Sequence, residues 1–152
     1  MAIRLEHSTT AKCRPEHIWK KFEDLEQWAW WNRVVGPCKW INGQPWQKGS
    51  RFHMELVKPR ALTIECTVLE CAPPGKVAWV GSGFGWRGEH WFSFEAQADG
   101  TTLLKTWEDF SGFIPVFFGN GTKRKTVDAY AAWLDALKFE AERLAREESA
   151  RS

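Results

Sequence analysis

The sequence predicts an α+β fold: a curved antiparallel sheet of about seven strands wrapped around one long C-terminal helix, with two short helices after the first strand. Three observations predict it. From residue 38 to residue 112, short runs of alternating apolar and polar residues are separated by turn residues, as in strands joined by hairpins. No helical pattern lies between these runs, which is typical of an antiparallel meander. Beyond residue 122, apolar residues recur at helical spacing.

The N-terminal region predicts one strand and then two short helices. Residues 2–12 alternate between apolar and polar side chains, as in a strand. Pro15 suits the first turn of a helix, where no partner is needed for a backbone N–H. Three large apolar residues spaced by three predict a second short helix over residues 24–31, and Gly36-Pro37 is expected to end this region.

Six further strands are predicted in the central part of the chain. Asn, Gly and Pro residues between the alternating runs mark the turns. The expected strands cover residues 38–41, 51–57, 61–71 and 76–84, followed by the two strands of a hairpin between residues 86 and 112.

The final hairpin turns at Asp99-Gly100, a strong hairpin signal. A two-residue loop would place His90 opposite Asp109. A three-residue loop over residues 98–100, with Gly100 left-handed, would place His90 opposite Glu108. The second register buries one fewer charged residue, so we prefer it. In both registers the histidine faces a carboxylate.

One amphipathic helix of about 25 residues, near 37 Å long, is predicted after a loop over residues 119–122. Its apolar stripe is the only one able to cover the sheet, so we expect it to pack there. The stripe consists of Val127, Tyr130, Leu134, Leu137, Ala141 and Leu144. The basic run 123–125 at its start is either a solvated turn or a site for a ligand carboxylate near the helix N–H groups.

Composition excludes several classes of function. The charge is almost balanced, with 21 Lys and Arg against 19 Asp and Glu, which argues against nucleic-acid binding. No run of 18 apolar residues occurs, so we expect no stable membrane insertion. The first residues lack the apolar core of a signal peptide, and we expect a cytoplasmic protein. The chain of 152 residues fits a single domain over residues 1–152, with a core over about residues 2–147.

The histidines and cysteines do not have metal-ligand spacing, and we expect neither a metal nor a cofactor. The four cysteines include no Cys-x-x-Cys pair and are expected to be reduced. They are Cys13, Cys38, Cys66 and Cys71, and the histidines are His7, His17, His53 and His90.

The order of elements and several short motifs resemble the SRPBCC superfamily, the START-like helix-grip proteins, in its polyketide cyclase/dehydrase branch. The resemblance covers nearly the whole chain. It is carried by residues 15–19 (Pro-Glu-His-Ile-Trp), 28–34, 49–52 (Gly-Ser-Arg-Phe), 90–94 (His-Trp-Phe-Ser-Phe) and 108–112 (Glu-Asp-Phe-Ser-Gly). It implies a hydrophobic pocket under the long helix. Members of the superfamily bind lipids, polyketides, steroids or other apolar molecules, and some are aromatases or cyclases.

The aromatic content of 11 Trp and 10 Phe fits either a well-filled core or a ligand cavity. We expect binding, with transport or sequestration as its purpose, of a small hydrophobic or aromatic ligand such as a lipid or polyketide. A homodimer is compatible with this, and so is an interaction module whose aromatic residues fill the interior. The expected ligand-binding residues are Trp86, Phe92, Thr106, Phe110, Phe117, Tyr130, Trp133, Leu134 and Leu137.

The alternative function is that of an enzyme resembling a polyketide cyclase or dehydratase. His90 and Glu108 would then be catalytic, because a carboxylate beside a histidine can fix its tautomer and raise its pKa. The same pair would also arise if each side chain merely satisfied the other's hydrogen bonds or oriented a polar group of the ligand.

Overall fold

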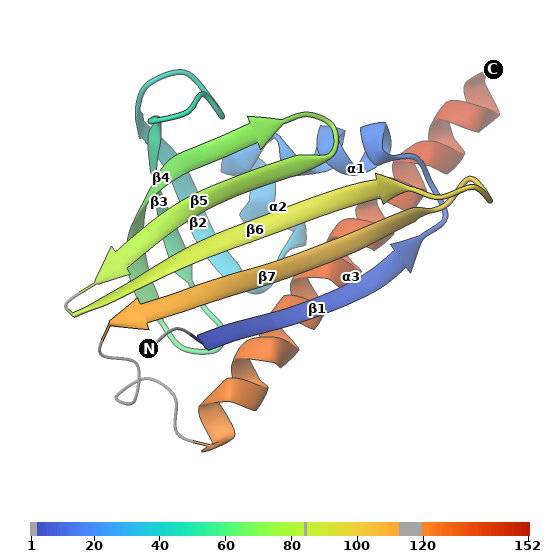
Figure 1. Cartoon of the computed structure of the whole chain (residues 1–152). Helices are drawn as coiled ribbons and strands as arrows, with labels where there is room; N and C mark the ends of the chain where they lie inside the picture. Colours follow the sequence, from blue (N-terminus) through green and yellow to red (C-terminus); the bar gives the residue numbers. More distant parts are fainter. Residues whose placement is uncertain (1–2, 84, 113–119) are drawn as a thin grey trace.

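The computed structural model describes residues 3–83, 85–112 and 120–152, and in it one sheet curves around a long C-terminal helix (Figure 1). The elements follow the order expected from the sequence. They are β1 (Ile3–Ala11), α1 (Pro15–Phe22), the 3₁₀ helix η1 (Leu25–Gln27), α2 (Trp28–Trp31), β2 (Val35–Asn42), β3 (Arg51–Leu56), β4 (Leu62–Ala72), β5 (Lys76–Gly83), β6 (Trp86–Ala96), β7 (Thr102–Gly112) and α3 (Asn120–Arg151).

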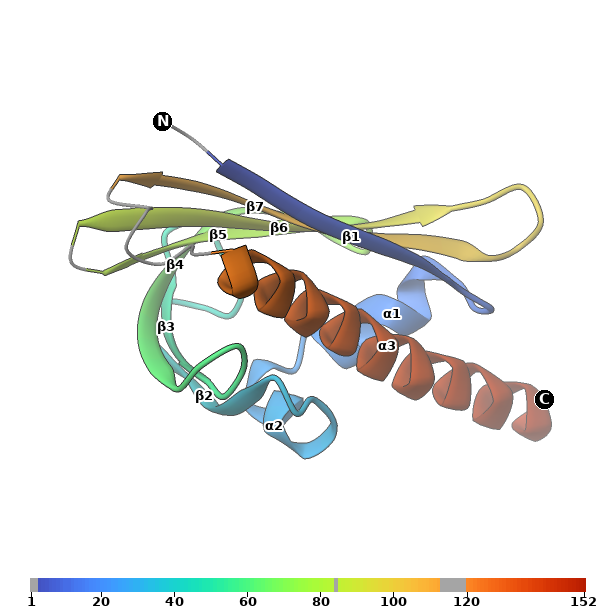
Figure 2. The same cartoon turned by 90° about the horizontal axis from the view of Figure 1, so that it is seen from below.

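The seven strands form one antiparallel sheet in the order β1-β7-β6-β5-β4-β3-β2. The strands from β2 to β7 follow one another as a meander, and β1 joins the sheet beside β7 at the far edge. The short helices therefore connect the two edges of the sheet. This arrangement leaves its concave face to α3, as the view from below shows (Figure 2).

The β6–β7 hairpin has the three-residue loop preferred from the sequence. Ala96 pairs with Thr102, and His90 pairs with Glu108. Gly100 has a φ of 87°, the left-handed conformation that glycine adopts without a steric penalty. The loop is closed by a hydrogen bond from the Gln97 N–H to the Thr101 carbonyl at 2.8 Å. The register prediction is therefore confirmed.

Helix α3 is held against the sheet by one buried face and against α1 by polar contacts. Its buried apolar residues recur at helical spacing, as the sequence predicts. His17 in α1 lies 3.0 Å from Glu148, and the Lys12 backbone N–H donates to Glu142 at 2.7 Å. The buried residues of α3 are Thr126, Ala129, Tyr130, Trp133, Leu134, Leu137 and Ala141.

The start of β2 and the second predicted short helix differ from the sequence prediction. Strand β2 begins at Val35, so Gly36 and Pro37 lie within a strand and do not end the preceding region. An edge strand tolerates this proline because it needs a partner on one side only, and the β2–β3 register shifts between Val35 and Cys38. The second predicted short helix is divided into η1 and α2.

Helix α3 is also longer than expected. It has 32 residues and begins at Asn120, so residues 120–122 of the predicted loop are helical, whereas residue 119 lies outside the described residues. Asparagine, glycine and threonine are each less favourable than alanine inside a helix by at most about 1 kcal/mol, which tertiary packing can override. None of the described helices has the length of apolar sequence that a bilayer crossing requires.

Seven interlocked aromatic side chains, here called the aromatic cluster, fill the space where α1 and α2 meet the sheet and α3. Neighbouring ring centroids lie 4.9–6.3 Å apart. The indole N–H of Trp28 donates to the Phe22 carbonyl at 2.7 Å, which satisfies this buried donor. The cluster consists of Phe22, Trp28, Trp46, Phe52, Trp79, Phe92 and Trp133. All seven side chains are buried.

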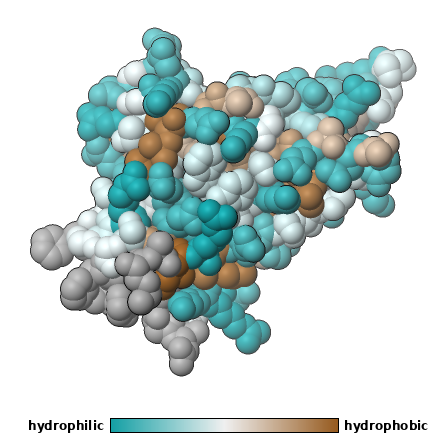
Figure 3. All heavy atoms as spheres, viewed as in Figure 1, coloured by the Kyte–Doolittle hydropathy of each residue, from teal (hydrophilic) through white to brown (hydrophobic). Residues whose placement is uncertain are grey.

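The outer face of the sheet, which is the face toward the viewer in Figure 1, is mostly hydrophilic. Hydrophobic residues appear on it only in small separate groups (Figure 3). Trp91 and Trp107 stack there with an interplanar angle of 2°, and the Lys76 ammonium lies 4.9 Å from the Trp91 ring. The Arg4 guanidinium lies 5.9 Å from the Trp107 ring, so a cation lies over each of these two rings. The buried aromatic cluster lies on the inner face of the sheet.

Candidate functional site

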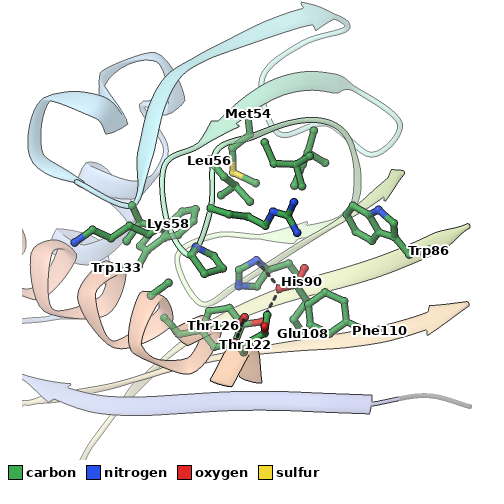
Figure 4. A pocket seen from close by; sticks show the side chains of 17 residues that line it. Met54, Leu56, Lys58, Trp86, His90, Glu108, Phe110, Thr122, Thr126 and Trp133 are labelled. Atoms are coloured by element: carbon green, nitrogen blue, oxygen red, sulfur yellow. Dashed lines mark hydrogen bonds and ion pairs between the residues drawn. The ribbon is translucent and has the colours of Figure 1, made fainter. Parts of the chain in front are cut away.

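A cavity of about 110 Å³ lies between the sheet and the first half of α3, next to the aromatic cluster. Strands β3, β4, β6 and β7 supply its walls, and the loop between β3 and β4 crosses it (Figure 4). The lining residues are Val34, Met54, Leu56, Lys58, Pro59, Arg60, Leu62, Ile64, Trp86, His90, Glu108, Phe110, Thr122, Thr126, Ala129, Tyr130 and Trp133.

The apolar wall follows from strand alternation in β3 and β4. Met54 pairs with Ile64, and both side chains point to the inner face because successive residues alternate across a sheet. Gly81 in the neighbouring strand leaves room for Ile64, since a Cβ at Gly81 would lie 2.7 Å from the Ile64 methyl carbon. Glycine at position 81 therefore allows the Ile64 side chain to occupy its place in this wall.

His90 is the buried polar group of the β6 wall, with 5% of its surface exposed. The Thr106 hydroxyl donates to the Trp91 carbonyl at 3.0 Å, so its oxygen is left to accept a hydrogen bond from His90 Nε2–H at 2.8 Å. This arrangement puts the proton on Nε2 and leaves a lone pair on Nδ1. Burial lowers the pKa of His90 to about 3, and the ring is neutral at physiological pH.

His90 Nδ1 has no hydrogen-bond partner among the described residues. The nearest acidic oxygen, Glu108 Oε1, lies 3.9 Å away, which is beyond hydrogen-bond distance. The catalytic alternative uses a carboxylate that bonds the histidine and raises its pKa, and this geometry supplies neither effect. Thr106 fixes the tautomer, and the dominant effect on the pKa is burial.

Glu108 faces His90 from β7, and 17% of its side chain is exposed. Burial raises its pKa to about 7, although a 2.6 Å hydrogen bond from the Tyr130 hydroxyl to Oε1 opposes this rise. Gly88 makes room for the carboxyl group, because a Cβ there would lie 2.9 Å from Oε2. The carboxyl group is therefore present in both protonation states near neutral pH.

Together these groups give an apolar cavity with two neighbouring polar functions. His90 Nδ1 can accept a hydrogen bond from a ligand. The Glu108 carboxyl group can donate or accept one according to its protonation state. Over the ranges 3–83, 85–112 and 120–152, no three His, Cys, Asp or Glu side chains converge as metal ligands.

The structure brings most of the sequence-predicted site residues together. The cavity is lined by Trp86, His90, Glu108, Phe110, Tyr130 and Trp133. Phe92 belongs to the aromatic cluster, Thr106 supports His90 from behind, and Leu134 and Leu137 are fully buried in the core. Phe117 lies outside the described residues.

The sequence prediction missed the contribution of the β3–β4 hairpin. Its signal was present in part, because the alternation of Met54, Leu56 and Ile64 already placed them on one face. No comparable pattern marked the loop residues Lys58 and Arg60. The basic run Lys123, Arg124 and Lys125 is exposed and outside the cavity lining, whereas Thr122 and Thr126, one turn apart, line it.

This curved sheet around a long helix, with a hollow between them, defines the START-like helix-grip class. The chain matches the family described as polyketide cyclase/dehydrase and lipid transport over residues 2–146, and it belongs to that family. A comparison with curated proteins gives no match.

Solved structures agree with the fold. A START superfamily protein from Mycobacterium smegmatis superposes with a TM-score of 0.76 at 17% identity, covering 93% of this chain and 98% of that one. The Zhui aromatase/cyclase from Streptomyces sp. R1128 gives 0.75 at 14% identity, covering 94% and 95%. A hypothetical protein from Helicobacter pylori gives 0.75 at 17% identity, covering 93% and 88%.

Proposed function

We propose that this protein binds a small hydrophobic molecule in the cavity and orients one hydroxyl group of that molecule against His90 and Glu108. The observation that carries the proposal is the lone pair of His90 Nδ1, which has no hydrogen-bond partner among the described residues and lies beside Glu108 in a largely apolar lining. An acceptor that borders a largely apolar cavity gains a hydrogen bond when a ligand hydroxyl donates to it there. The family description, which includes lipid transport, supports the same kind of ligand.

The size of the cavity limits what can be enclosed. Its 110 Å³ is somewhat less than the roughly 150 Å³ of a dry protein cavity known to hold benzene. One small ring or a short alkyl segment would therefore sit inside. Any longer part would extend past the exposed lining residues Lys58, Arg60 and Leu62, which mark the mouth of the cavity.

Native mass spectrometry of the purified protein, with organic extraction of whatever co-purifies, tests this proposal. Titration with p-cresol provides a defined probe. In the variant Ala129→Phe a ring would fill the cavity, because Ala129 lines it and is 5% exposed. Ala132→Phe is the matched control, since Ala132 is exposed on the same helix.

We expect wild type and Ala132→Phe to bind p-cresol with similar affinity, and Ala129→Phe to lose at least about tenfold in affinity. Equal binding by all three proteins would show that the cavity is not the binding site.

The second candidate function is acid/base catalysis, and the pKa of about 7 for Glu108 favours it. A carboxyl group with this pKa can remove a proton from the carbon beside a carbonyl and return it to a departing hydroxyl, which leaves as water. The probe is the dehydration of 4-hydroxy-4-phenylbutan-2-one, followed by the absorbance of the enone product.

If the protein is such an enzyme, Glu108→Gln should lower turnover by about 10²-fold or more while ligand affinity changes little. An absence of turnover in wild type, together with retained p-cresol binding, would leave binding as the function.

A further inference from the structure

The mouth of the cavity carries two cations, Lys58 and Arg60. Lys58 and Arg60 both line the cavity, both are exposed, and neither forms an ion pair with another described residue. Four arginines elsewhere on the surface form ion pairs, namely Arg4, Arg51, Arg87 and Arg143, whereas Arg60 shares its lack of one among the described residues with other exposed arginines and differs from them in lining the cavity. The two cations at the mouth are therefore free to meet a charge brought by a ligand.

The backbone that carries these cations is anchored. The N–H groups of Val57 and Lys58 both donate to the Val34 carbonyl, at 2.8 and 3.1 Å. Val34 is itself buried and lines the cavity. The Lys58 side chain is directed away from His90 (Figure 4). Of the two cations, we therefore assign the main role to Arg60, whose planar guanidinium can bind both oxygens of a carboxylate.

The charges inside the cavity also favour an anion at the mouth over an anion at the inner end. Among the described residues that line the cavity, Glu108 is the only acidic one, and it already accepts a hydrogen bond from the Tyr130 hydroxyl. A ligand anion would be repelled from this end whenever Glu108 is ionised, whereas a neutral hydroxyl is accepted by His90. The two ends of the cavity therefore differ. The inner end, at His90, suits a neutral hydrogen-bond donor, and the mouth, at Lys58 and Arg60, suits an anion.

We propose that the ligand is a hydroxy acid, whose hydroxyl group donates to His90 inside the cavity and whose carboxylate binds Arg60 at the mouth, with Lys58 as the second cation. The apolar part between them would lie against Met54, Leu56 and Ile64. This inference rests on the proposed binding function and adds the chemical class of the ligand and the residues that select it.

The test uses acids and neutral amides of the same shape. The probes are 4-hydroxybenzoate, 4-hydroxyphenylacetate and 3-(4-hydroxyphenyl)propionate, each compared with its primary amide by calorimetric titration at low salt. The series varies the distance from hydroxyl to carboxylate. We expect at least one acid to bind wild type about tenfold more tightly than its amide, and this preference should weaken as salt is added.

Arg60→Gln should abolish that preference while amide binding stays unchanged. Lys48→Gln is the control, because Lys48 is an exposed cation in a turn that does not line the cavity. If acids and amides bind wild type equally well, the carboxylate site is wrong and the proposed binding function stands. If neither the acids, the amides nor p-cresol bind, the binding function itself is overturned, and this inference with it.

Discussion

Two titratable groups, His90 and Glu108, lie side by side in the sheet wall of the cavity, and their pKa values are shifted so that both tend to be neutral. Burial lowers the pKa of His90 to about 3 and raises that of Glu108 to about 7. The sequence predicts that His90 and Glu108 are paired across two strands, but it does not predict either pKa shift. The sequence specifies a register, whereas a pKa depends on how much water the packed neighbours exclude.

These shifts have opposite effects on stability. Between pH 4.5 and about 7, the folded protein holds a proton on Glu108 that the unfolded chain releases, so this group makes the protein less stable as the pH rises. Between about pH 3 and 6.5, the unfolded chain binds a proton at His90 that the folded protein excludes, so this group makes the protein more stable as the pH rises.

We therefore predict that Glu108→Gln gains stability relative to wild type as the pH rises from 4.5 to 7. The expected gain is about 2 kcal/mol, less than the full conversion of the shift because the side chain is partly exposed. Urea unfolding of both proteins at pH 4.5, 6 and 7.5 measures the difference, in which other titrating groups cancel. A difference that does not change with pH would contradict the raised pKa.

At the scale of single elements, the β6–β7 hairpin was the most predictable part of the protein. Its register followed from the loop and from the burial of one charge fewer, which are local features of the sequence. The start of β2 was not predictable in this way. Gly36-Pro37 normally marks a turn, and only the edge position of β2, which is a property of the whole sheet, makes a strand acceptable there.

The loop of this hairpin supports a second prediction. Gly100 has a φ of 87° and has open space where a Cβ would lie, so Gly100→Ala should cost about 1 kcal/mol through backbone strain alone. Gly121 also has open space but lies in the first turn of α3, so Gly121→Ala should be neutral or stabilising. Thermal unfolding of the two variants should show shifts that differ in sign or size. Equal shifts would mean that the left-handed conformation is not the cause.

At the scale of the whole molecule, the sequence predicted the fold well and the extent of the cavity poorly. The order of strands and the apolar stripe of α3 are each indicated by many residues, so the prediction does not depend on any single one. The boundary between solid core and cavity depends instead on how individual rings fit together. The sequence left a filled interior and a cavity as alternatives, and both occur: the aromatic cluster fills one part, and the cavity occupies another.

Trp133 belongs to both parts and separates them, which supports a third prediction. Trp133→Ala should join the cavity to space vacated in the aromatic cluster and cost about 3 kcal/mol. We expect the lower end of the usual range because the indole N–H of Trp133 has no hydrogen-bond partner among the described residues.

Urea unfolding measures the loss of stability, and binding of 2-naphthol relative to p-cresol measures the enlarged cavity. Loss of stability without improved relative binding of 2-naphthol would show that the site collapses.

The position of the aromatic cluster has a consequence for how ligand preference could diverge among proteins of this fold. The rings of the cluster pack inside the molecule, whereas backbone groups make the pairing of the strands, so replacing a ring beside the cavity alters the space for a ligand while the backbone pairing is kept. Preference for a ligand of a given length could then drift by single substitutions, each tolerated by the same scaffold. His90 and Glu108 would meanwhile keep binding the same polar group, so only the length of the rest of the ligand would change.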